Sequence, residues 1–524
     1  MDVLVVGAGP TGLMMACQLA IHKVSFRIID KKLQPSSYSG ALIVHARTME
    51  IFEQIGIAEK VLQKSMQANL LSIVFNGVKK AQISLKNIGQ GLSQFPNLYL
   101  IEQSKTEQIL IDFILASGNR IEWNTELISF SMTDSTVTSV IQAGGGQAEK
   151  IESTYLIAAD GGNSFVREQL RIPFVGRKHP ISLFIIDCKA EFDLPADEMC
   201  FSFSNHSTSG FFPLMEGRRR IDGLIPSSLE GKIKITFEDI EKNFAERLRM
   251  KIRLFSPEWF SVSHSYQRYA LNYQQNNIFL AGDAAHTFTP VGAQGMNTGL
   301  QDAYNLAWKL AYTIQKKAKP SLLWTYSKER KDIAKKTVLS TGKIYRLVSS
   351  RNVFIKTFRI GLLPYLMKWI LPLIEKHKKL RKYSFTTISE IGINYRKSPL
   401  SFTASYGNFP KHSPKPGDRM PYLVYIENER KINIHEKLKG IKFTLYIFLG
   451  ESNSNEIESI ATKYKSILTI KIIELTADSK HLFYQLGIKK SGFYLVRPDM
   501  YIAYRSSALV FNHLEKYIDQ YLKV

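Results

Sequence analysis

The chain contains few cysteines. Cys17, Cys188 and Cys200 are the only three among 524 residues. This scarcity excludes a disulfide framework and any Cys-x-x-Cys pair for metal or redox chemistry. No cluster of histidines and carboxylates has the spacing of metal ligands, so we expect no metal. The sequence starts directly with a strand-like pattern at Asp2-Val3, without the basic region and cleavage site of a signal peptide. We therefore expect a reducing, cytoplasmic compartment.

Long hydrophobic runs are also lacking. The longest apolar window, residues 360–374, is too short to span a bilayer and contains Lys368 and two prolines. A transmembrane helix is therefore not expected. Two interpretations stay open, a helix buried between domains, which we favour, or a helix lying on a membrane surface beside the basic residues that follow it. Those residues are Lys376, Lys378, Lys379, Arg381 and Lys382.

Acidic residues are in the minority, with 46 against 69 lysines and arginines, and the formal net charge is +23. A nucleic-acid-binding protein would gather this excess on one face with interleaved aromatic residues. Here the lysines are scattered along the chain, so we expect no nucleic-acid partner. The apolar fraction of 44% is typical of a soluble globular protein. Because the length exceeds what one core usually fills, we expect two to three domains.

The N-terminal sequence has the pattern of a dinucleotide-binding βαβ unit. An apolar strand at 3–6 leads into Gly7-Ala-Gly9-Pro-Thr-Gly12, which is followed by a helix and by a second strand that ends at Asp30. The first glycine makes the turn, the second lets the backbone approach a pyrophosphate, and the third lets the helix pack on the strand. Asp30 stands where an acid accepts a hydrogen bond from a ribose hydroxyl. This unit predicts an ADP-containing cofactor. Since no second GxGxxG follows, any second dinucleotide binds without its own Rossmann domain.

A later stretch, residues 277–310, combines a strand, a glycine-rich crossing and a helix. The apolar run 278–281 predicts a buried strand, which ends at Asp283. The crossing then leads into a helix whose apolar residues recur at helical spacing after Asn297. A carboxylate accepts hydrogen bonds from hydroxyl groups, and the first N–H groups of a helix face negative charge. The stretch is therefore suited to hold a polyol and an anion.

A third strand ends in the same way. The run 155–159 stops at Asp160-Gly161, ahead of a helix with an arginine in its first turns, and this predicts a second edge that faces phosphate or ribose. Arg47 opens an amphipathic helix, where it could reach phosphate or ribityl oxygens or pair with a surface acid. Gln103 stands near the beginning of another helix.

Together, three motifs resemble those of the class A flavoprotein monooxygenases, the para-hydroxybenzoate and phenol hydroxylase-like aromatic hydroxylases. They are the N-terminal GxGxxG, DGxxSxxR at 160–167 and GDAAHxxxPxxxxGxN at 282–297, in the order found in that family. The resemblance extends from residue 1 to about residue 340. The wording of the third motif is most similar to that of the phenol, chlorophenol and polyketide hydroxylases.

The resemblance implies tightly bound FAD, with NAD(P)H as a transient co-substrate. The N-terminal glycines would hold the ADP half, Asp283 the ribityl chain, and the start of the later helix the negatively charged edge of the flavin. Pro290 would lie beside the isoalloxazine. The implied cofactor-binding residues are Gly7, Gly9, Gly12, Asp30, Arg47, Gln103, Asp160, Gly161, Gly282, Asp283, Pro290, Gly295, Met296 and Asn297.

Residues 175–268 carry alternating, strand-rich patterns, and the resemblance implies a substrate sheet above the flavin. Arg268 could orient a phenolate or tie this sheet to the flavin domain, and we favour the second role. His45 and Tyr269 are further candidates for polar contacts, whereas His286 is expected to be architectural. Aromatic residues in a sheet are more often plain core, yet four are candidate pocket walls: Phe201, Phe203, Phe211 and Phe212.

The expected fold is α/β, with a Rossmann-like FAD-binding domain, a β-sheet substrate domain, a helical connection and a thioredoxin-like C-terminal domain. The last unit has no cysteine and cannot perform thiol chemistry, so we expect a role in packing or in a homodimer. The expected boundaries are 1–174 with 269–340 for the FAD-binding domain, 175–268 for the substrate domain, which 70–100 could join, 341–404 for the connection and 405–524 for the C-terminal domain.

The reaction implied by the resemblance is hydroxylation of a phenolic or polyketide-like aromatic substrate through a flavin C4a-hydroperoxide. Some phenol hydroxylases carry an acid shortly before the position of Arg47, where this chain has the apolar residues 41–44. This difference favours a larger or already acidic substrate over a simple phenol. Two alternatives stay open. One is another FAD-dependent oxidation or reduction of a polyketide, terpenoid or antibiotic, and the other is a membrane-surface-associated flavoprotein without turnover.

Overall fold

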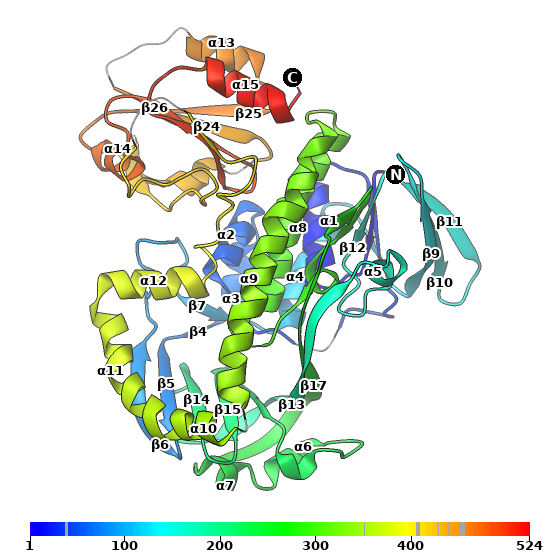
Figure 1. Cartoon of the computed structure of the whole chain (residues 1–524), viewed down its shortest axis with the longest axis vertical. Helices are drawn as coiled ribbons and strands as arrows, with labels where there is room; N and C mark the ends of the chain where they lie inside the picture. Colours follow the sequence, from blue (N-terminus) through cyan, green and yellow to red (C-terminus); the bar gives the residue numbers. More distant parts are fainter. Residues whose placement is uncertain are drawn as a thin grey trace.

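The computed structural model describes residues 1–36, 40–290, 292–350, 352–404, 409–427, 429–438, 440–450 and 456–523. The three sequence motifs follow strands of one six-stranded sheet (Figure 1). All strands except the edge strand β18 run parallel, and β1 is buried along its whole length, which explains its uninterrupted apolar sequence. The order is β18 (Gln274–Gln275), β19 (Ile278–Leu280), β12 (Tyr155–Ala158), β1 (Val3–Val6), β2 (Phe26–Ile29) and β8 (Ile121–Glu122).

Three helices pack together beside this sheet. Helix α1 contacts both α4 and α8, and the apolar faces of all three contribute to the largest hydrophobic core of the protein. Their bounds are α1 (Pro10–Ile21), α4 (Gln103–Ala116) and α8 (Gln294–Ile314). A three-stranded antiparallel meander of β9 (Thr125–Met132), β10 (Val137–Ala143) and β11 (Ala148–Ser153) lies between β8 and β12 in the chain.

A second sheet has eight strands and is built mainly from the middle of the chain. Its two longest members, β13 and β17, run antiparallel over 18 residues each and connect it to the first sheet. Residues 70–84 also belong to it, because β5 pairs with β14. The order is β20 (His286–Thr287), β17 (Arg253–Ala270), β13 (Phe174–Glu191), β16 (Arg218–Leu224), β15 (Thr208–Pro213), β14 (Glu198–Phe203), β5 (Leu70–Phe75) and β6 (Val78–Ser84).

The two faces of the eight-stranded sheet have different neighbours. One face, here called the back face, packs on α6 (Phe237–Glu241) and α7 (Phe244–Leu248) and forms a separate core. The other, the front face, contributes Phe203 and Phe212 to the core that it shares with the six-stranded sheet domain. Because successive side chains of a strand point to opposite faces, the position of a residue along its strand decides whether its side chain can face the three motifs.

Helices connect this core to the C-terminal domain. The long α9 (Trp324–Ser349) is followed by an arch of α10 (Val353–Thr357), a π-helical turn (Phe358–Leu362), α11 (Leu363–Lys376) and α12 (Lys378–Ile388), which curves outside β5 and β6 (Figure 1). The helical stretch from Val353 to Lys376 has 24 residues, which is long and apolar enough to cross a membrane by length and composition alone. It is longer than the sequence window indicated, because the helix continues through the π-helical turn.

The favoured interpretation of this stretch as a helix buried between domains is wrong. One side of α11 packs on β6, but Tyr365 and Trp369 on the other side are 69% and 72% exposed.

The C-terminal domain has a five-stranded sheet flanked by helices. The sheet order is β21 (Phe402–Thr403), β27 (Ile502–Ser506), β26 (Gly492–Val496), β24 (Phe443–Leu449) and β25 (Leu468–Glu474). The flanking helices are α13 (Glu456–Lys463), α14 (Lys480–Leu486) and α15 (Asn512–Tyr521), and a hairpin joins β22 (Val424–Glu427) to β23 (Arg430–Asn433).

Candidate active site

The glycine loop after β1 combines two tightly packed positions with one open position. A Cβ at Gly7 would lie 2.3 Å from the carbonyl oxygen of Ala159, and a Cβ at Gly12 would lie 1.8 Å from that of Gly7. A Cβ at Gly9 would meet no protein atom of the described residues within 4 Å. Gly9 also precedes α1, whose N-terminus has no side-chain cap. The loop therefore leaves room and free N–H groups where a pyrophosphate would bind.

Asp30 lies beside this loop at the end of β2. Its buried carboxylate accepts hydrogen bonds from the N–H groups of Ala8, at 2.7 Å, and Lys32, at 2.9 Å. Each oxygen has one such partner and a carboxylate oxygen can accept two hydrogen bonds, so capacity remains for a ribose hydroxyl.

The second motif follows β12, the neighbour of β1. Asp160 accepts a hydrogen bond through Oδ2 from the N–H of Val166, at 3.2 Å. Its buried Oδ1 has no partner among the described residues, and burial raises the pKa of this carboxyl. A buried carboxylate oxygen without a partner is costly, which marks Asp160 as a residue that a ligand would satisfy. Gly161 follows with φ +87 and open space around it.

The third motif is in direct contact with the other two. A Cβ at Gly282 would lie 2.4 Å from Oγ1 of Thr11 in the glycine loop. A Cβ at Gly162 would lie 3.4 Å from Cγ2 of Thr287. Since β1, β12 and β19 are neighbouring parallel strands, their carboxyl ends meet at one edge of the sheet. The three motifs, far apart in the sequence, thus form one site.

Asp302 holds the third motif in place through its carboxylate. Its Oδ2 accepts hydrogen bonds from the N–H of Gly282, at 3.0 Å, and pairs with Nε2 of His286, at 2.6 Å. Its Oδ1 accepts a hydrogen bond from Nε of Arg330, also at 2.6 Å. All three side chains are fully buried. These contacts give His286 an architectural role.

The start of helix α8 is held by the side chain of Asn297. Its Oδ1 accepts hydrogen bonds from the N–H of His45, at 3.0 Å, and the hydroxyl of Thr48, at 2.7 Å, while Nδ2 donates to the carbonyls of Ile43 and Ala293. The amide is therefore fully used by the protein. The backbone of this turn, rather than the Asn297 side chain, is available to a ligand.

His45 braces the same crossing. Its Nε2 lies 3.1 Å from the carbonyl oxygen of Gly292, and its Nδ1 has no partner among the described residues. Burial lowers the pKa of His45 to about 4, so the ring is neutral at physiological pH and Nε2 donates the hydrogen bond. His45 thus positions the loop, and its neutral Nδ1 is an unused acceptor.

Negative charge would be stabilised at the beginning of α8. Gln294, Gly295 and Met296 are its first residues, and their N–H groups have no partner within the helix. Asp283 lies nearby with an exposed side chain. Exposed Pro290 lies in the loop between them. The arrangement offers a hydroxyl acceptor beside an anion-binding helix terminus.

The front face of the eight-stranded sheet supplies an aromatic wall. Phe201 and Phe212 pack edge to face, with ring centroids 5.7 Å apart, and Phe203 lies on the same face. Phe211 differs from the expectation, because it is buried in the back-face core, where its ring lies 6.1 Å from that of Phe244. Adjacent strand residues point to opposite faces, so Phe211 and Phe212 cannot line the same pocket.

Charged residues that the sequence analysis did not single out lie on the front face, among them Arg220, its partner Asp187 and Asp222. Arg220 forms a buried bidentate pair with Asp187, at 2.6 and 2.7 Å, and donates to the carbonyl of Ala41 in the first domain. Asp222 follows two residues later and is half-buried. Its register partner Gly210 is also that of Phe201, which places the carboxyl in the row of the aromatic wall. Burial raises the pKa of Asp222 to about 6.

Arg268 and Tyr269 lie where the long strand β17 joins the third motif. They pair in register with Thr287 and His286, respectively. The guanidinium of Arg268 lies over the ring of Tyr266, 4.7 Å from its centroid. Arg167, the arginine of the second motif, is buried; its guanidinium donates to the carbonyls of Ala284, at 3.0 Å, and Gly162, at 2.9 Å. Arg268 therefore places a positive charge beside the third motif, where it is suited to an anionic ligand.

Arg47 and Gln103 bind other parts of the protein. The buried guanidinium of Arg47 donates to the carbonyl of Asp499, at 2.8 Å, and pairs with Glu50, at 3.3 Å. The guanidinium of Arg47 is therefore engaged at the boundary with the C-terminal domain in this structure. Gln103 accepts a hydrogen bond from the N–H of Ala41, at 2.9 Å, and donates to Glu107. It braces the loop before β3 (Ile43–Val44).

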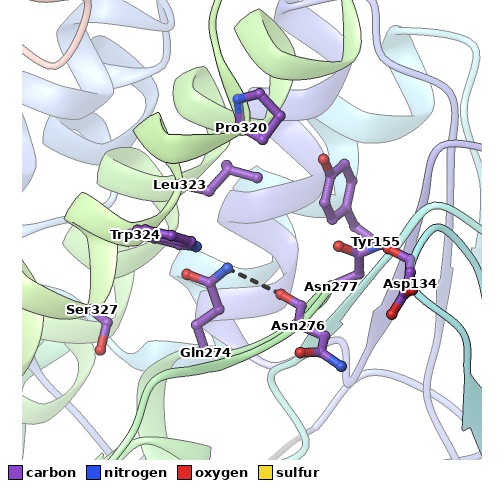
Figure 2. A pocket seen from close by; sticks show the side chains of 9 residues that line it. All are labelled: Asp134, Tyr155, Gln274, Asn276, Asn277, Pro320, Leu323, Trp324 and Ser327. Atoms are coloured by element: carbon purple, nitrogen blue, oxygen red, sulfur yellow. Dashed lines mark hydrogen bonds between the residues drawn. The ribbon is translucent and has the colours of Figure 1, made fainter. Parts of the chain in front are cut away.

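An open surface pocket of about 400 Å³ lies at the opposite end of the sheet (Figure 2). Tyr155, the first residue of β12, and Asn277, which precedes β19, line it together with Trp324 at the start of α9. These are the amino ends of strands whose carboxyl ends carry the motifs. The pocket is therefore separate from the candidate active site.

Comparison with known proteins places this geometry in a family. Residues 1–341 match the FAD binding domain family. The 6-methylpretetramide 4-monooxygenase of Streptomyces rimosus is 28% identical, over 96% of this chain and 90% of the relative. Pentachlorophenol 4-monooxygenase of Sphingobium chlorophenolicum is 29% identical, over 85% of this chain and 79% of the relative. The solved structure of the flavin-dependent monooxygenase PieE in complex with FAD and substrate superimposes with a TM-score of 0.80 at 20% identity, covering 99% of this chain and 97% of the other.

The fit of the site to its cofactor rests on the structure as well. The open cradle at Gly9, the unpartnered oxygen of Asp160 and the uncapped start of α8 lie along one sheet edge and suit a pyrophosphate, a ribose or polyol, and an anionic ring. The match covers well over half of the chain. This protein therefore belongs to the FAD binding domain family, its cofactor is FAD, and it is a flavoprotein monooxygenase.

Proposed function

We propose that this enzyme uses NAD(P)H and oxygen to hydroxylate a phenolic or polyketide-like aromatic substrate that is bound between the three-motif edge and the front face. The observation that carries the proposal is the convergence of the three motifs beside an aromatic wall. A binding protein would need the dinucleotide cradle alone. The second sheet, with an aromatic surface and a titratable carboxyl facing the first domain, adds what a ring substrate requires.

When bound, FAD supplies electron transfer and oxygen activation, and the residues of this chain position and protect it. The cradle at Gly9 and the carboxylate of Asp30 would hold the ADP half. Asp283 would accept hydrogen bonds from the ribityl hydroxyls. The N–H groups at the start of α8 would stabilise negative charge on the flavin ring. Phe201 and Phe212 would exclude water from the reacting face.

Asp222 is the residue that we assign to accept a proton from a phenolic substrate. A ring hydroxyl becomes a better electron donor as it loses its proton, and a nearby carboxylate lowers the barrier for that transfer. A pKa of about 6 leaves Asp222 ionised at neutral pH while it remains more basic than an ordinary aspartate. Arg268, beside the third motif, would attract the phosphates of NAD(P)H.

The substrate class follows from the wall and from the relatives. Phe201, Phe203 and Phe212 give the front face a large apolar area, beside which lie Asp222 and the Arg220–Asp187 pair. The relatives named above are monooxygenases of 6-methylpretetramide and of pentachlorophenol. A fused or substituted phenolic ring fits both.

The decisive experiment measures NADH and NADPH oxidation by the purified, FAD-loaded protein with a panel of phenols and aromatic polyketides. We expect one group of substrates to accelerate oxidation and to yield a product that is one oxygen atom heavier. Peroxide release and product mass are followed in the same reaction. Cofactor oxidation that yields peroxide with every ring would contradict the substrate class, and a protein that cannot bind FAD would overturn the function.

Asp283→Ala provides a variant that tests the cofactor site directly. We expect its FAD affinity to fall by roughly tenfold or more, because charged hydrogen-bond acceptors to the ribityl chain are lost. Asp332→Ala, an exposed aspartate on α9, is the matched control and should bind FAD like the unmodified protein. Equal affinities for the two variants would remove Asp283 from the site.

A further inference from the structure

The helical arch from Val353 to Ile388 is apolar on two opposite sides. On one side, Met367, Leu371 and Ile374 recur at helical spacing and pack on the core beneath β6. In α12, Phe385 faces inward, where its ring fills the space beside Gly89. A helix that is apolar all round is usually covered all round. Here only the inward side is covered by the described residues.

The outward side carries a continuous apolar stripe. Leu362, Tyr365, Leu366, Trp369, Ile370 and Leu373 follow one another at intervals of three, one, three, one and three residues, which aligns them on one face. Phe354 extends the stripe toward the N-terminal end of the arch with an exposure of 85%. Tyr383 extends the exposed aromatic surface into α12 with 71%. Single exposed apolar residues are ordinary, whereas a stripe of this length marks an interaction surface.

Basic residues accompany this stripe almost without acids. Residues 352–388 contain one acidic residue, Glu375. Arg359 is buried and caps the end of α9 by donating to carbonyls, among them that of Val348, at 2.6 Å. Seven lysines and arginines remain accessible: Lys356, Lys368, Lys376, Lys378, Lys379, Arg381 and Lys382. The surface is therefore amphipathic, aromatic and strongly positive.

We propose that this arch docks the enzyme onto an anionic membrane surface. Tyrosine and tryptophan side chains favour the boundary between head groups and acyl chains. Lysines beside an inserted apolar stripe pair with anionic lipid head groups, and several such pairs add up to stable attachment. Both requirements are met by Tyr365, Trp369 and Tyr383 together with the basic segment 376–382.

Two other ways of covering the outward side of the arch agree less well with the geometry. A two-fold dimer through this face would bring the basic segments of two copies together, because such an interface places the same patch on both partners. A membrane-spanning placement would need the inward side to leave β6, where Leu371 is buried, and would carry Lys368 into the bilayer. Lying on the surface keeps the inward packing and leaves the lysines near the head groups.

The inference goes beyond the proposed function, because it concerns where the enzyme works. Helix α11 lies against β6, the edge strand of the eight-stranded sheet (Figure 1). Docking through the arch would place that sheet directly over the lipid. Apolar aromatic compounds partition into lipid, so an enzyme held there would meet such compounds at a higher concentration than in water.

Flotation of the FAD-loaded full chain with vesicles tests the proposal. We expect it to float with phosphatidylcholine vesicles that contain phosphatidylglycerol, and to bind at least about tenfold less to phosphatidylcholine alone or at high salt. Trp369→Glu should abolish flotation. Trp324→Glu is the matched control, since Trp324 is equally exposed, at 71%, but lies outside the arch.

A charge variant gives independent information. Replacing Lys378, Lys379, Arg381 and Lys382 by Gln should lower binding to anionic vesicles by about tenfold or more, whereas replacing the exposed α9 residues Lys335, Lys336 and Lys343 by Gln should not. Each variant is used only if it retains FAD and NAD(P)H oxidation.

Three results would overturn the proposal. The first is that the unmodified protein fails to float with any vesicle. The second is that Trp369→Glu floats as well as Trp324→Glu. The third is light scattering that shows a dimer which Trp369→Glu converts to a monomer, since the face would then be an interface between copies.

Discussion

Glu329 of helix α9 accepts two hydrogen bonds from Arg497 of the C-terminal domain, at 2.7 and 3.0 Å, and both side chains are fully buried. Lys309 of α8 donates to the same carboxylate at 2.8 Å, and burial lowers the pKa of this lysine to about 8. Asp499 pairs with the other side of Arg497. The C-terminal domain is therefore joined to the flavin domain by charges that water does not reach.

Replacing Arg497 by Met should destabilise the protein strongly. Glu329 would remain buried with Lys309 as its one charged partner among the described residues, and breaking a buried pair costs about 3–5 kcal/mol. The free energy of unfolding, measured with denaturant, checks this. Arg396→Gln is the control, because Arg396 forms an equally close pair with Asp418 at the surface and should cost less than about 1 kcal/mol. Similar losses for both variants would show that the buried pair contributes no more than a surface pair.

Replacing Gly9 by Ala should separate folding from cofactor binding. The backbone of Gly9 is extended, with φ −77 and ψ −177, and a Cβ there meets no described protein atom, so the apoprotein should keep its stability. The methyl group would occupy space needed by the pyrophosphate, and we expect FAD affinity to fall about tenfold or more.

Gly12→Ala is the contrasting variant for that experiment. Its Cβ would lie 1.8 Å from the carbonyl oxygen of Gly7, so it should lower the melting temperature of the apoprotein itself. Thermal unfolding of the apoproteins and FAD titration measure the two effects. If Gly9→Ala bound FAD normally, the cradle would lie elsewhere.

Replacing Asp222 by Asn should lower turnover by about 100-fold or more and change its pH dependence. The carboxyl must be ionised to accept a proton, so kcat/KM of the unmodified enzyme should fall as the pH drops through about 6. The Asn variant should lack this acidic limb.

Stability distinguishes this role from simple misfolding. Because folding raises the pKa of Asp222, its ionisation above pH 6 opposes folding, and Asp222→Asn should be at least as stable as the unmodified protein at pH 8. Asp187→Asn breaks the buried pair with Arg220, so it should lower stability and keep the acidic limb. An acidic limb that persists in Asp222→Asn would exclude Asp222 as the proton acceptor.

Glu390 should make stability depend on pH. This buried side chain accepts hydrogen bonds from Thr298 and Gln301, and burial raises its pKa to about 8. The folded state therefore holds a proton that the unfolded state releases near pH 4.5. This stabilisation is complete below pH 4.5 and is lost as the pH rises toward 8.

The variant Glu390→Gln removes this titration. Relative to the unmodified protein, its free energy of unfolding should increase between about pH 5 and pH 8, by on the order of 2 kcal/mol. Denaturant unfolding at several pH values measures the difference. A constant difference across this range would show that Glu390 ionises with an ordinary pKa.

Much of the site could be predicted because its motifs are local. A strand, a tight turn and a helix follow within a few residues of Gly7, Asp160 and Asp283, and parallel strands bring their carboxyl ends together without further information. The face of a strand residue also follows from alternation alone. Phe211 and Phe212 are adjacent in one strand, so alternation alone assigns them to opposite faces. Asp222 lies two residues from Arg220, the register partner of Phe212, and therefore shares the face of Phe212, but this step requires the register of the sheet.

The remaining features depend on contacts that no local pattern contains. Arg47 meets Asp499, which lies 452 residues away in the chain, so its approach to a phosphate was equally plausible from sequence. Glu390 became unusual only because helix α8 surrounds it with Thr298 and Gln301. Likewise, the apolar window around Trp369 could not reveal which of its two sides the sheet would cover.

The chain of contacts that fixes the third motif also determines how the molecule comes apart. Arg330 holds Asp302 with one nitrogen and the hydroxyl of Tyr395 with another, at 2.9 Å, and the ring of Tyr395 packs on Tyr501 of the C-terminal domain. If either domain unfolded alone, charged side chains of the other would remain buried without their partners. Heating should therefore give a single heat-absorption peak in calorimetry, as expected of one cooperative unit, despite the division of the chain into separate sheets.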